Sequence, residues 1–377
     1  MTLSVILLTV AFAATELFAV FFADICPDRL ILSKLFGADA DLGMSFQEII
    51  LNQSFGDLSY PNAKKEPQST LPPAPSEPSE PPATEPSAPQ DTPQATPPTV
   101  EPEKPTPELP DDPPIPSGMK PIISMDLSLS SFGLDYLHNT SSKSPNMSLL
   151  SQFELSTDIS AVYPKNSPLV LIVHTHGTES YSSKSWYDPA AEVARSKDKN
   201  ENVISIGRRV ADILNENGII TLHSDIMHDE ESYGGSYSRS AETVKKYLSK
   251  YPTIRYVIDI HRDAVIKSSG ELVGAVAQTE KGAAAQIMAV IGTGEDGTPC
   301  KNYMGNLALA QKFRELLLRE SETLCRPTCL RPSAYNQQYA AYSMLIEVGA
   351  AGNSLAEAKL SAEYIGNALA RIIVGEG

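Results

Sequence analysis

Three apolar runs after residue 168 each end on a residue that can bind a metal or move a proton. They span residues 169–176, 254–261 and 344–347 and end on His176, His261 and Glu347. Each run predicts a buried strand, because aliphatic and β-branched residues follow one another between turn signals. In an open parallel sheet the carboxyl ends of the strands line one crevice, and ligands bind there. Two histidines and a glutamate that converge there are the minimum set for a hydrolytic zinc site.

Outside these runs, the chain after residue 168 alternates between strand and helix patterns. Apolar residues at helical spacing predict helices over 202–217, 240–250, 306–320 and 354–373, and further short apolar runs predict strands over 219–223, 272–277 and 287–291. Ser354 and Glu357 form a capping box at the start of the last helix. The alternation predicts an α/β domain with a mostly parallel sheet flanked by helices.

Composition divides the chain into four parts. They are an apolar N-terminal segment over 1–25, a membrane-proximal segment over 26–66, a proline-rich linker over 67–117 and a catalytic α/β domain over 118–377. The first segment is long enough to cross a bilayer, since about 20 apolar residues suffice. An uncleaved signal anchor and a cleaved signal peptide are both open, and both place the rest of the chain outside the cytoplasm.

The linker and the charge exclude some functions. Residues 67–117 hold 19 prolines, nine acidic residues and one lysine, a composition that cannot bury a core and predicts a disordered, extended tether. The whole chain has a net charge of −16. We therefore expect no nucleic-acid partner, because such proteins need basic patches.

The four cysteines favour structural roles. They are Cys26, Cys300, Cys325 and Cys329. Cys325 and Cys329 are close enough for a disulfide, whereas a zinc knuckle would need more cysteine or histidine nearby. Buried thiols or one bridge are the two interpretations left open.

Two histidines follow the first run. The spacing of His174 and His176 puts both imidazoles on one face if the strand continues. Gly177 would let the backbone turn sharply and come close to a ligand. The alternative is that hydrogen bonds in the core satisfy these histidines, but two of them followed by Gly177-Thr-Glu179 favour function.

The other two runs carry acidic residues suited to proton chemistry. Asp259 lies two positions before His261, where it can orient the second ring nitrogen. Arg262 and Asp263 follow, so the alternative is an ion cluster at a strand end. Glu347 lies in an apolar strand, and burial raises a carboxyl pKa enough to make the group a general acid or base near neutral pH. Its alternative is a structural glutamate paired with an arginine.

The segments around these residues resemble stage II sporulation protein P. The matching stretches are His174-Thr-His-Gly-Thr-Glu-Ser-Tyr181, Asn202-Val-Ile-Ser-Ile-Gly-Arg-Arg-Val210, Ile258-Asp-Ile-His-Arg-Asp263 and Ile346-Glu-Val-Gly-Ala-Ala-Gly-Asn353. The resemblance covers residues 120–377. It implies a membrane-anchored cell-wall hydrolase that faces septal peptidoglycan in a sporulating bacterium and acts during engulfment. It also implies N-acetylmuramoyl-L-alanine amidase and endopeptidase activity, with two partners: sporulation protein D, a lytic transglycosylase, and sporulation protein M.

The family's fold is similar to that of zinc amidases, whose ligands are His, Glu and His, with a late catalytic glutamate. By that resemblance His176 and His261 bind Zn²⁺ and Glu347 is catalytic. His174 is the reserve ligand.

The middle glutamate of those amidases has no direct counterpart in this chain. It stands just before the first long helix, where this chain has Lys199. Asp198 and Glu201 lie beside that position, and either is a candidate third ligand.

Two other functions stay open. A zinc carboxypeptidase or deacylase on a similar scaffold would need a cation to clamp a free carboxylate, and Arg262 and Arg331 are candidates. A catalytically decayed wall-binding module would explain a missing third ligand.

Overall fold

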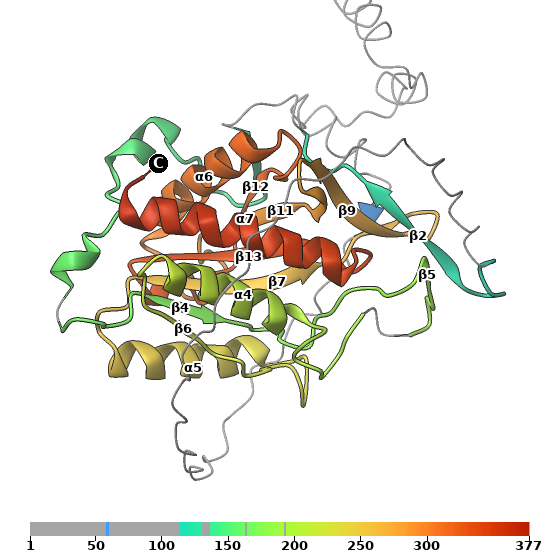
Figure 1. The fold of residues 1–377 in the computed structure, drawn as a ribbon, viewed down its shortest axis with the longest axis horizontal. Coiled ribbons are helices and arrows are strands. Elements are labelled where there is room, and N and C mark those ends of the chain that lie inside the picture. Colours follow the sequence, from blue (N-terminus) through green and yellow to red (C-terminus); the bar gives the residue numbers. More distant parts are fainter. Residues whose placement is uncertain (1–57, 60–113, 130–135, 163, 192–193, 377) are drawn as a thin grey trace, which may run out of the picture. The chain divides into compact units, whose positions relative to one another are not determined.

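The computed structural model describes residues 58–59, 114–129, 136–162, 164–191 and 194–376 (Figure 1). The predicted membrane segment over 1–25, the segment 26–66 apart from residues 58–59, the linker as far as residue 113, and Cys26 lie outside them. Among the helices in the described ranges, none combines the length and the apolar character needed to cross a membrane.

A seven-stranded sheet forms the centre of the domain. Its order is β3 (Leu137–Asn139), β12 (Thr328–Arg331), β11 (Ile287–Gly292), β13 (Tyr342–Ala350), β7 (Tyr256–Asp263), β4 (Val170–Val173) and β6 (Thr221–His223). The strands β4, β7 and β13 contain the three apolar runs, and nearly all of their residues are buried. This sheet positions the candidate site.

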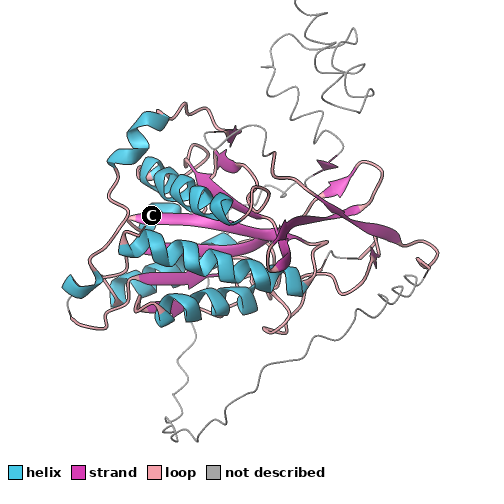
Figure 2. Cartoon of the chain, turned by 45° about the horizontal axis from the view of Figure 1, so that its top comes forward, coloured by secondary structure: helices cyan, strands magenta, loops and turns pink. Residues whose placement is uncertain are grey.

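Helices cover both faces of this sheet (Figures 1 and 2). They are α4 (Val203–Glu216), α5 (Ser236–Lys250), α6 (Tyr303–Glu320) and α7 (Leu355–Val374). Residues of α4, α6 and α7 pack with one set of strand side chains in the largest core cluster, which includes Ile172, Ile260 and Ile346. The alternate set, including Leu171 and Val257, packs with Val244 of α5. The predicted capping box at Ser354 and Glu357 is confirmed and begins α7.

A second, smaller sheet lies beside the domain core. Its strands are β1 (Leu58–Ser59), β8 (Ile266–Lys267), β9 (Leu272–Thr279), β2 (Lys120–Met125) and β5 (Trp186–Tyr187), and β10 (Gly282–Ala285) pairs with β9. Three short 3₁₀ helices complete the described elements: η2 (Met147–Gln152), η3 (Ile159–Ala161) and η4 (Gln337–Tyr339).

The expectation of a mostly parallel sheet is wrong, because both sheets are mixed. Six strand pairings are parallel and five are antiparallel. The cause is the tight connection from β9 through β10 to β11, which leaves no room for a helix. A parallel neighbour needs a crossover of a dozen or more residues. The chain therefore enters the central sheet with β11 antiparallel to β13.

The three cysteines in the described part of the chain are free and buried. Burial raises the pKa of the Cys300 thiol to about 11 and that of Cys325 to about 12. Of the two interpretations, buried thiols are therefore the one observed at Cys325 and Cys329.

Candidate metal centre

Three buried side chains with ligand atoms meet at the carboxyl ends of β4 and β7. They are His176, Glu179 and His261, and one ligand atom from each lies within 4.8 Å of the other two. Their exposed fractions are 6, 6 and 2%. The set contains two imidazoles and one carboxylate, which are the nitrogen and oxygen ligands that zinc takes in proteins.

Both imidazoles turn the same nitrogen toward the carboxylate. His176 Nδ1 lies 3.5 Å from Glu179 Oε1, and His261 Nδ1 lies 3.4 Å from Glu179 Oε2. The second nitrogen of each ring lies close to a side chain outside the cluster. His176 Nε2 is 3.0 Å from Ser236 Oγ, and His261 Nε2 is 3.0 Å from Asp259 Oδ1. The Asp259 carboxylate favours a proton on His261 Nε2, and a proton on Nε2 of either ring would let Nδ1 bind a metal once any proton on Nδ1 is displaced.

The loop after β4 aims Glu179 at the two histidines. Thr175 anchors its start, because its backbone N–H and hydroxyl both donate to the Asp259 carboxylate, at 2.9 and 2.6 Å. Thr178 anchors its end by donating twice to the buried Asp229 carboxylate, which also pairs with Arg195 at 2.6 Å.

Gly177 lies in a sharp turn, as expected, since the Glu179 N–H donates to the His176 carbonyl at 3.1 Å. A Cβ at this position would lie 2.8 Å from the Met227 backbone, a distance that side-chain carbons essentially never show. The glycine therefore also permits the close approach of the segment around Met227.

Arg262 ties the two ligand-bearing segments together. Its backbone N–H donates to Glu179 Oε2 at 3.1 Å, and its guanidinium donates to the carbonyls of Ser180 and Ala194 at 3.0 and 2.7 Å. The position after His261 on β7 thus holds Glu179 and the chain that follows it. With its guanidinium committed to these carbonyls, Arg262 is not a clamp for a substrate carboxylate.

The charges of the cluster are strongly coupled. Burial alone would raise the pKa of Glu179, but contacts with His176, His261 and Arg262 hold it well below its usual value. Burial alone would lower the pKa of His261, but the carboxylates of Asp259 and Glu179 hold it well above its usual value. The metal-free cluster therefore carries a proton on His261, which a metal ion must displace.

Glu347 lies beside the cluster on β13. Its Cα pairs in register with that of His261 on β7, so the two side chains point to the same face. Burial, with the nearby carboxylate of Asp263, raises the pKa of Glu347 to about 8. Its Oε2 atom is buried with no hydrogen-bond partner, which leaves an acceptor free beside the cluster. The alternative of a structural glutamate paired with an arginine is not what the structure shows.

Aromatic side chains that sequence reasoning missed wall the cluster. Tyr233 stacks on His176 with ring centroids 4.4 Å apart, and Tyr237 contacts His176 edge-on at 5.5 Å. Tyr237 also lies parallel to the His261 ring at 6.5 Å. The signal for them was the Tyr-Gly-Gly-Ser-Tyr stretch at 233–237, where two glycines precede the N-terminus of α5.

His174, the expected reserve ligand, lies away from the cluster. It is fully buried, and its Nδ1 donates to the Ile260 carbonyl at 3.0 Å while its Nε2 lies 2.9 Å from His223 Nε2. Burial lowers its pKa to about 3 and that of His223 to about 4, so both rings are neutral. The expected shared face with His176 fails because β4 ends at Val173, and strand alternation ends with it.

Asp198 and Glu201, the expected third ligands, also lie outside the cluster. Both are exposed in the loop before α4 and bond within that loop: Asp198 Oδ1 accepts from the Asn200 N–H, and Glu201 Oε2 accepts from Ser196 Oγ. Glu179 takes the third-ligand position that was predicted for Asp198 or Glu201. Its spacing of three from His176, across a tight turn, was the signal in the sequence.

Comparison with known proteins gives one family. The family model described as stage II sporulation protein P matches residues 127–370. Stage II sporulation protein P of Bacillus subtilis (strain 168) is 27% identical over 206 residues, an alignment that covers 52% of this chain and 48% of that protein. The chain therefore spans about half the length of the curated relative it matches.

Solved structures of N-acetylmuramoyl-L-alanine amidases also align with this chain. The amidase of Nostoc punctiforme is 17% identical, with 53% of this chain and 94% of that chain covered and a TM-score of 0.32. The catalytic domain of an amidase of Bacillus (Paenibacillus) polymyxa is 11% identical, with 54% and 95% covered and a TM-score of 0.32. The Clostridium difficile 630 amidase is 15% identical, with 54% and 95% covered and a TM-score of 0.31.

Proposed function

The chain belongs to the stage II sporulation protein P family, and from this membership we propose that it is a zinc-dependent peptidoglycan hydrolase that cuts amide bonds. One observation carries the proposal: a buried His–Glu–His cluster lies next to a half-buried glutamate, Glu347, whose buried Oε2 atom has no hydrogen-bond partner. Peptidoglycan is a polymer of amino sugars and peptides. Amide bonds join its sugars to its peptides, and a hydrolytic site of this kind would cut them.

The residues present fit a zinc ion. His176 and His261 would hold it through Nδ1 and Glu179 through a carboxylate oxygen, since these atoms face one another. A zinc ion at this position would polarise the scissile carbonyl and lower the pKa of a water molecule. Ser236 and Asp259 would keep the imidazoles in orientation.

Glu347 would move the proton. It lies on the same face as His261, and its free Oε2 can accept the proton of an attacking water molecule. The same carboxyl group would then donate that proton to the leaving amine, because a pKa of about 8 lies close enough to neutral pH for the ionised form to accept a proton and the protonated form to give one up. Tyr233 and Tyr237 would limit bulk water around the reacting bond.

Two bonds in peptidoglycan suit this site. One joins muramic acid to L-alanine, and the other cross-links stem peptides, and both are amides. We therefore propose N-acetylmuramoyl-L-alanine amidase and endopeptidase activities at one centre, acting on septal wall during engulfment.

The apolar N-terminal sequence supports a location of the catalytic domain outside the cytoplasm. We propose that residues 1–25 anchor or export the chain and that the linker 67–117 lets the catalytic domain work outside the cytoplasm, away from the membrane. Sporulation protein D and sporulation protein M are the partners that the family resemblance implies.

The rival functions have less support. A carboxypeptidase needs a free cation at the site: the Arg262 guanidinium donates to two backbone carbonyls, which leaves Arg331, at the end of β12, as the one named candidate. A decayed wall-binding module was attractive because a third ligand was missing, and Glu179 removes that reason.

The test is release of soluble products from purified sacculi. Full-length protein with zinc should release muropeptides whose masses show free L-alanine amino termini and separated cross-links. Chelator should abolish release and added zinc should restore it. Release that continues undiminished in chelator would overturn the zinc mechanism, and products cut only at free carboxyl termini would favour the carboxypeptidase.

A further inference from the structure

An aromatic pocket of about 520 Å³ begins one residue after Glu179. We call it the Trp186 pocket. Its aromatic and apolar lining comprises Tyr181, Trp186, Tyr187, Leu272, Ala351 and Leu355. Trp186 and Tyr187 form β5, which pairs with Lys120 and Pro121 of β2 and is therefore fixed on a strand. Sites on strands hold side chains more rigidly than sites on loops.

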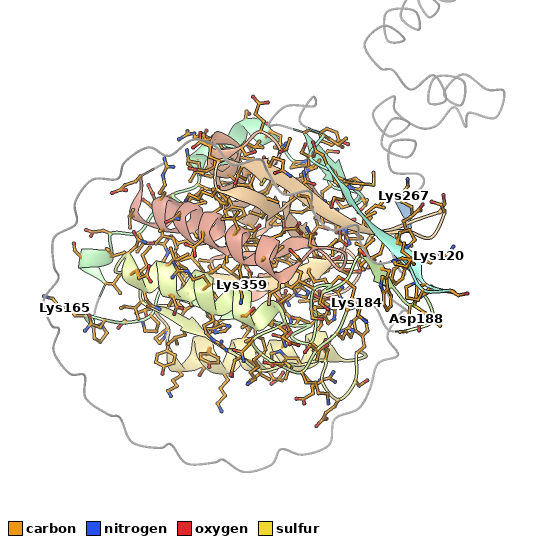
Figure 3. The ribbon with its side chains drawn as sticks, turned by 45° about the vertical axis from the view of Figure 1, so that its right-hand side comes forward. Lys120, Lys165, Lys184, Asp188, Lys267 and Lys359 are labelled. Atoms are coloured by element: carbon orange, nitrogen blue, oxygen red, sulfur yellow. The ribbon has the colours of Figure 1, made fainter. Side chains whose placement is uncertain are left out.

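The rim of the Trp186 pocket is polar and carries both charges. Lys184, Asp188 and Glu201 line it together with several serines. Figure 3 labels Lys184 and Asp188, which flank β5 on either side in sequence and lie on the same side of the molecule. Lys184 Nζ is 4.2 Å from the centre of the Trp186 ring. Pockets with an apolar floor and a few placed polar groups bind ligands that are themselves part apolar and part polar.

The segment that bears Glu179 connects the metal cluster to the pocket, because the next residue, Ser180, lines the pocket. Glu179 forms a β-bridge with Arg195, and Ser180 forms one with Asn202, so the segment that bears the ligand is also a wall of the pocket. Arg262 holds this wall by donating to the carbonyl of Ser180. A polymer long enough to pass from the cluster across this segment would reach the pocket.

We propose that the Trp186 pocket binds the glycan strand of peptidoglycan, with a sugar ring stacked on Trp186. The inference rests on the proposed function, because the amide bond at the cluster joins a sugar to a peptide. Pyranose rings present apolar C–H faces and a periphery of hydroxyl groups, which match an aromatic floor with a polar rim. An acidic peptide is a weaker candidate for this pocket. Arg195, which also lines it, pairs with Asp229 at 2.6 Å, so its charge is already balanced.

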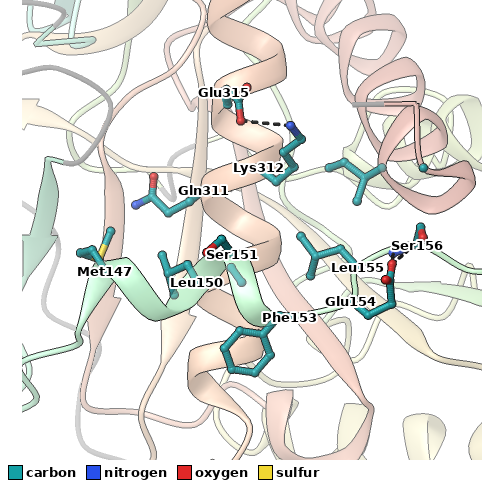
Figure 4. A pocket seen from close by; sticks show the side chains of 13 residues that line it. Met147, Leu150, Ser151, Phe153, Glu154, Leu155, Ser156, Gln311, Lys312 and Glu315 are labelled. Carbon is teal, nitrogen blue, oxygen red and sulfur yellow. Dashed lines mark hydrogen bonds and ion pairs between the residues drawn. The ribbon is translucent and has the colours of Figure 1, made fainter.

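Two other cavities lack these features. One of about 350 Å³ beside Tyr233 is lined by charged residues including Lys197, Glu230 and Glu231, and Tyr233 already stacks on His176. Another of about 500 Å³ lies between η2 and α6 (Figure 4). Its lining contains no residue next in sequence to a cluster residue, unlike Ser180 in the Trp186 pocket, and nothing in the structure shows what fills it.

The experiment uses the only tryptophan in the chain as its reporter. Full-length Glu347→Gln protein in chelator, which does not turn over, is titrated with peptide-free glycan strands while the emission of Trp186 is recorded. We expect a saturable change in emission. Tyr187→Ala in the same background should weaken binding at least about fivefold, because an aromatic contact of this kind is worth about 1 kcal/mol. Tyr251→Ala, at the end of α5 and outside the pocket, is the matched control and should bind like the parent.

Activity on sacculi gives the second readout. Trp186→Ala should raise KM more than it lowers kcat, and Trp186→Phe should restore most of the loss because it keeps a ring to stack on. An emission that ignores glycan strands would overturn the proposal, and so would one that responds only to free stem peptide. Normal sacculus hydrolysis with no glycan response refutes this inference alone. Glycan binding without any hydrolysis refutes the proposed function and leaves the glycan site standing.

Discussion

Glu347 and His261 occupy paired register positions on the neighbouring parallel strands β13 and β7. One residue lies in the metal-ligand cluster and the other is a carboxyl group with a pKa of about 8. Because paired residues in a parallel ladder share a face, the sheet itself sets a proton carrier beside a ligand. No loop needs to close to bring them together.

Glu347→Gln should abolish turnover and keep the metal. The amide preserves size and hydrogen bonding but cannot carry a proton, and loss of a general acid or base costs about 10²–10⁴-fold in rate. Product release from sacculi and zinc content, both measured on the purified variant, check this. Release at the wild-type rate would remove Glu347 from the mechanism, and loss of zinc would make it a ligand instead.

His176→Ala, Glu179→Ala and His261→Ala should each weaken zinc binding by at least about tenfold, the lower end of what even an outer contact costs. Competition against a fluorescent chelator measures this. Asp198→Ala and Glu201→Ala are the matched controls, because both residues are exposed carboxylates outside the cluster. Normal zinc affinity in all three cluster variants would show that the metal binds elsewhere.

Zinc uptake should release protons at pH 6.5. Asp259 and Glu179 hold the pKa of His261 well above its usual value, against the opposing effect of burial, so its imidazole is charged in the metal-free protein. Binding must displace that proton, and affinity should fall as the pH falls. Calorimetry in two buffers with different ionisation enthalpies counts the protons. Identical heats in both buffers would contradict the prediction.

Metal-free Glu347→Gln should be more stable than the wild type in alkaline solution. Burial raises the pKa of Glu347 from 4.5 to about 8, so the folded chain binds this proton more tightly than the unfolded chain does. Stability from this group is complete below about pH 4.5 and is lost as the pH rises through 8, at a cost of up to a few kcal/mol.

Urea unfolding in chelator at pH 4.5 and pH 8.5 measures the difference. The variant should gain stability over the wild type only at the higher pH, and the exposed Glu201→Gln should show no such change. Equal stabilities of wild type and Glu347→Gln at pH 8.5 would mean that the carboxyl group is solvated.

Gly207→Ala should destabilise the fold by about 1–3 kcal/mol, the usual cost of overpacking a core. A Cβ there would lie 2.5 Å from the His174 ring, which two hydrogen bonds hold in place. Gly297→Ala is the control, because nothing lies within 4 Å of the position that its added methyl group would take. Thermal unfolding of the two variants should separate them, and similar midpoints would show that His174 can move aside.

Local signals in the sequence predicted the elements well. The apolar runs at 169–176, 254–261 and 344–347 correspond to β4, β7 and β13, and the four predicted helices correspond to α4 to α7. Such patterns predict elements because the apolar periodicity and the capping residues of an element lie within its own sequence. The short strands β2, β3 and β12 were not predicted, since each lasts six residues or fewer and obtains its partners from distant segments.

The features that depend on tertiary contacts could not be predicted from local sequence patterns. The direction of β11 follows from the hairpin before it, and nothing within its own residues encodes that direction. His174 and His176 look equivalent in sequence, but only the end of β4 at Val173 decides which ring enters the cluster. Glu179 was not predicted as a ligand, because the family resemblance points to the residues just before the first long helix, although a tight turn brings the Glu179 carboxylate to His176. Tyr237 reaches the cluster from the first turn of α5, and the Tyr-Gly-Gly-Ser-Tyr stretch that contains it does not say where that turn packs.

The position of β7 and β13 in the central sheet has a consequence for how the protein loses activity. Both strands have neighbours on each side, whereas β3 and β6 are the edges. Proteins open first where backbone pairing is incomplete, so fluctuations at the edges expose amides without separating His261 from Glu347. Heating should therefore leave the centre assembled until the whole sheet comes apart, and inactivation should follow global unfolding rather than fraying.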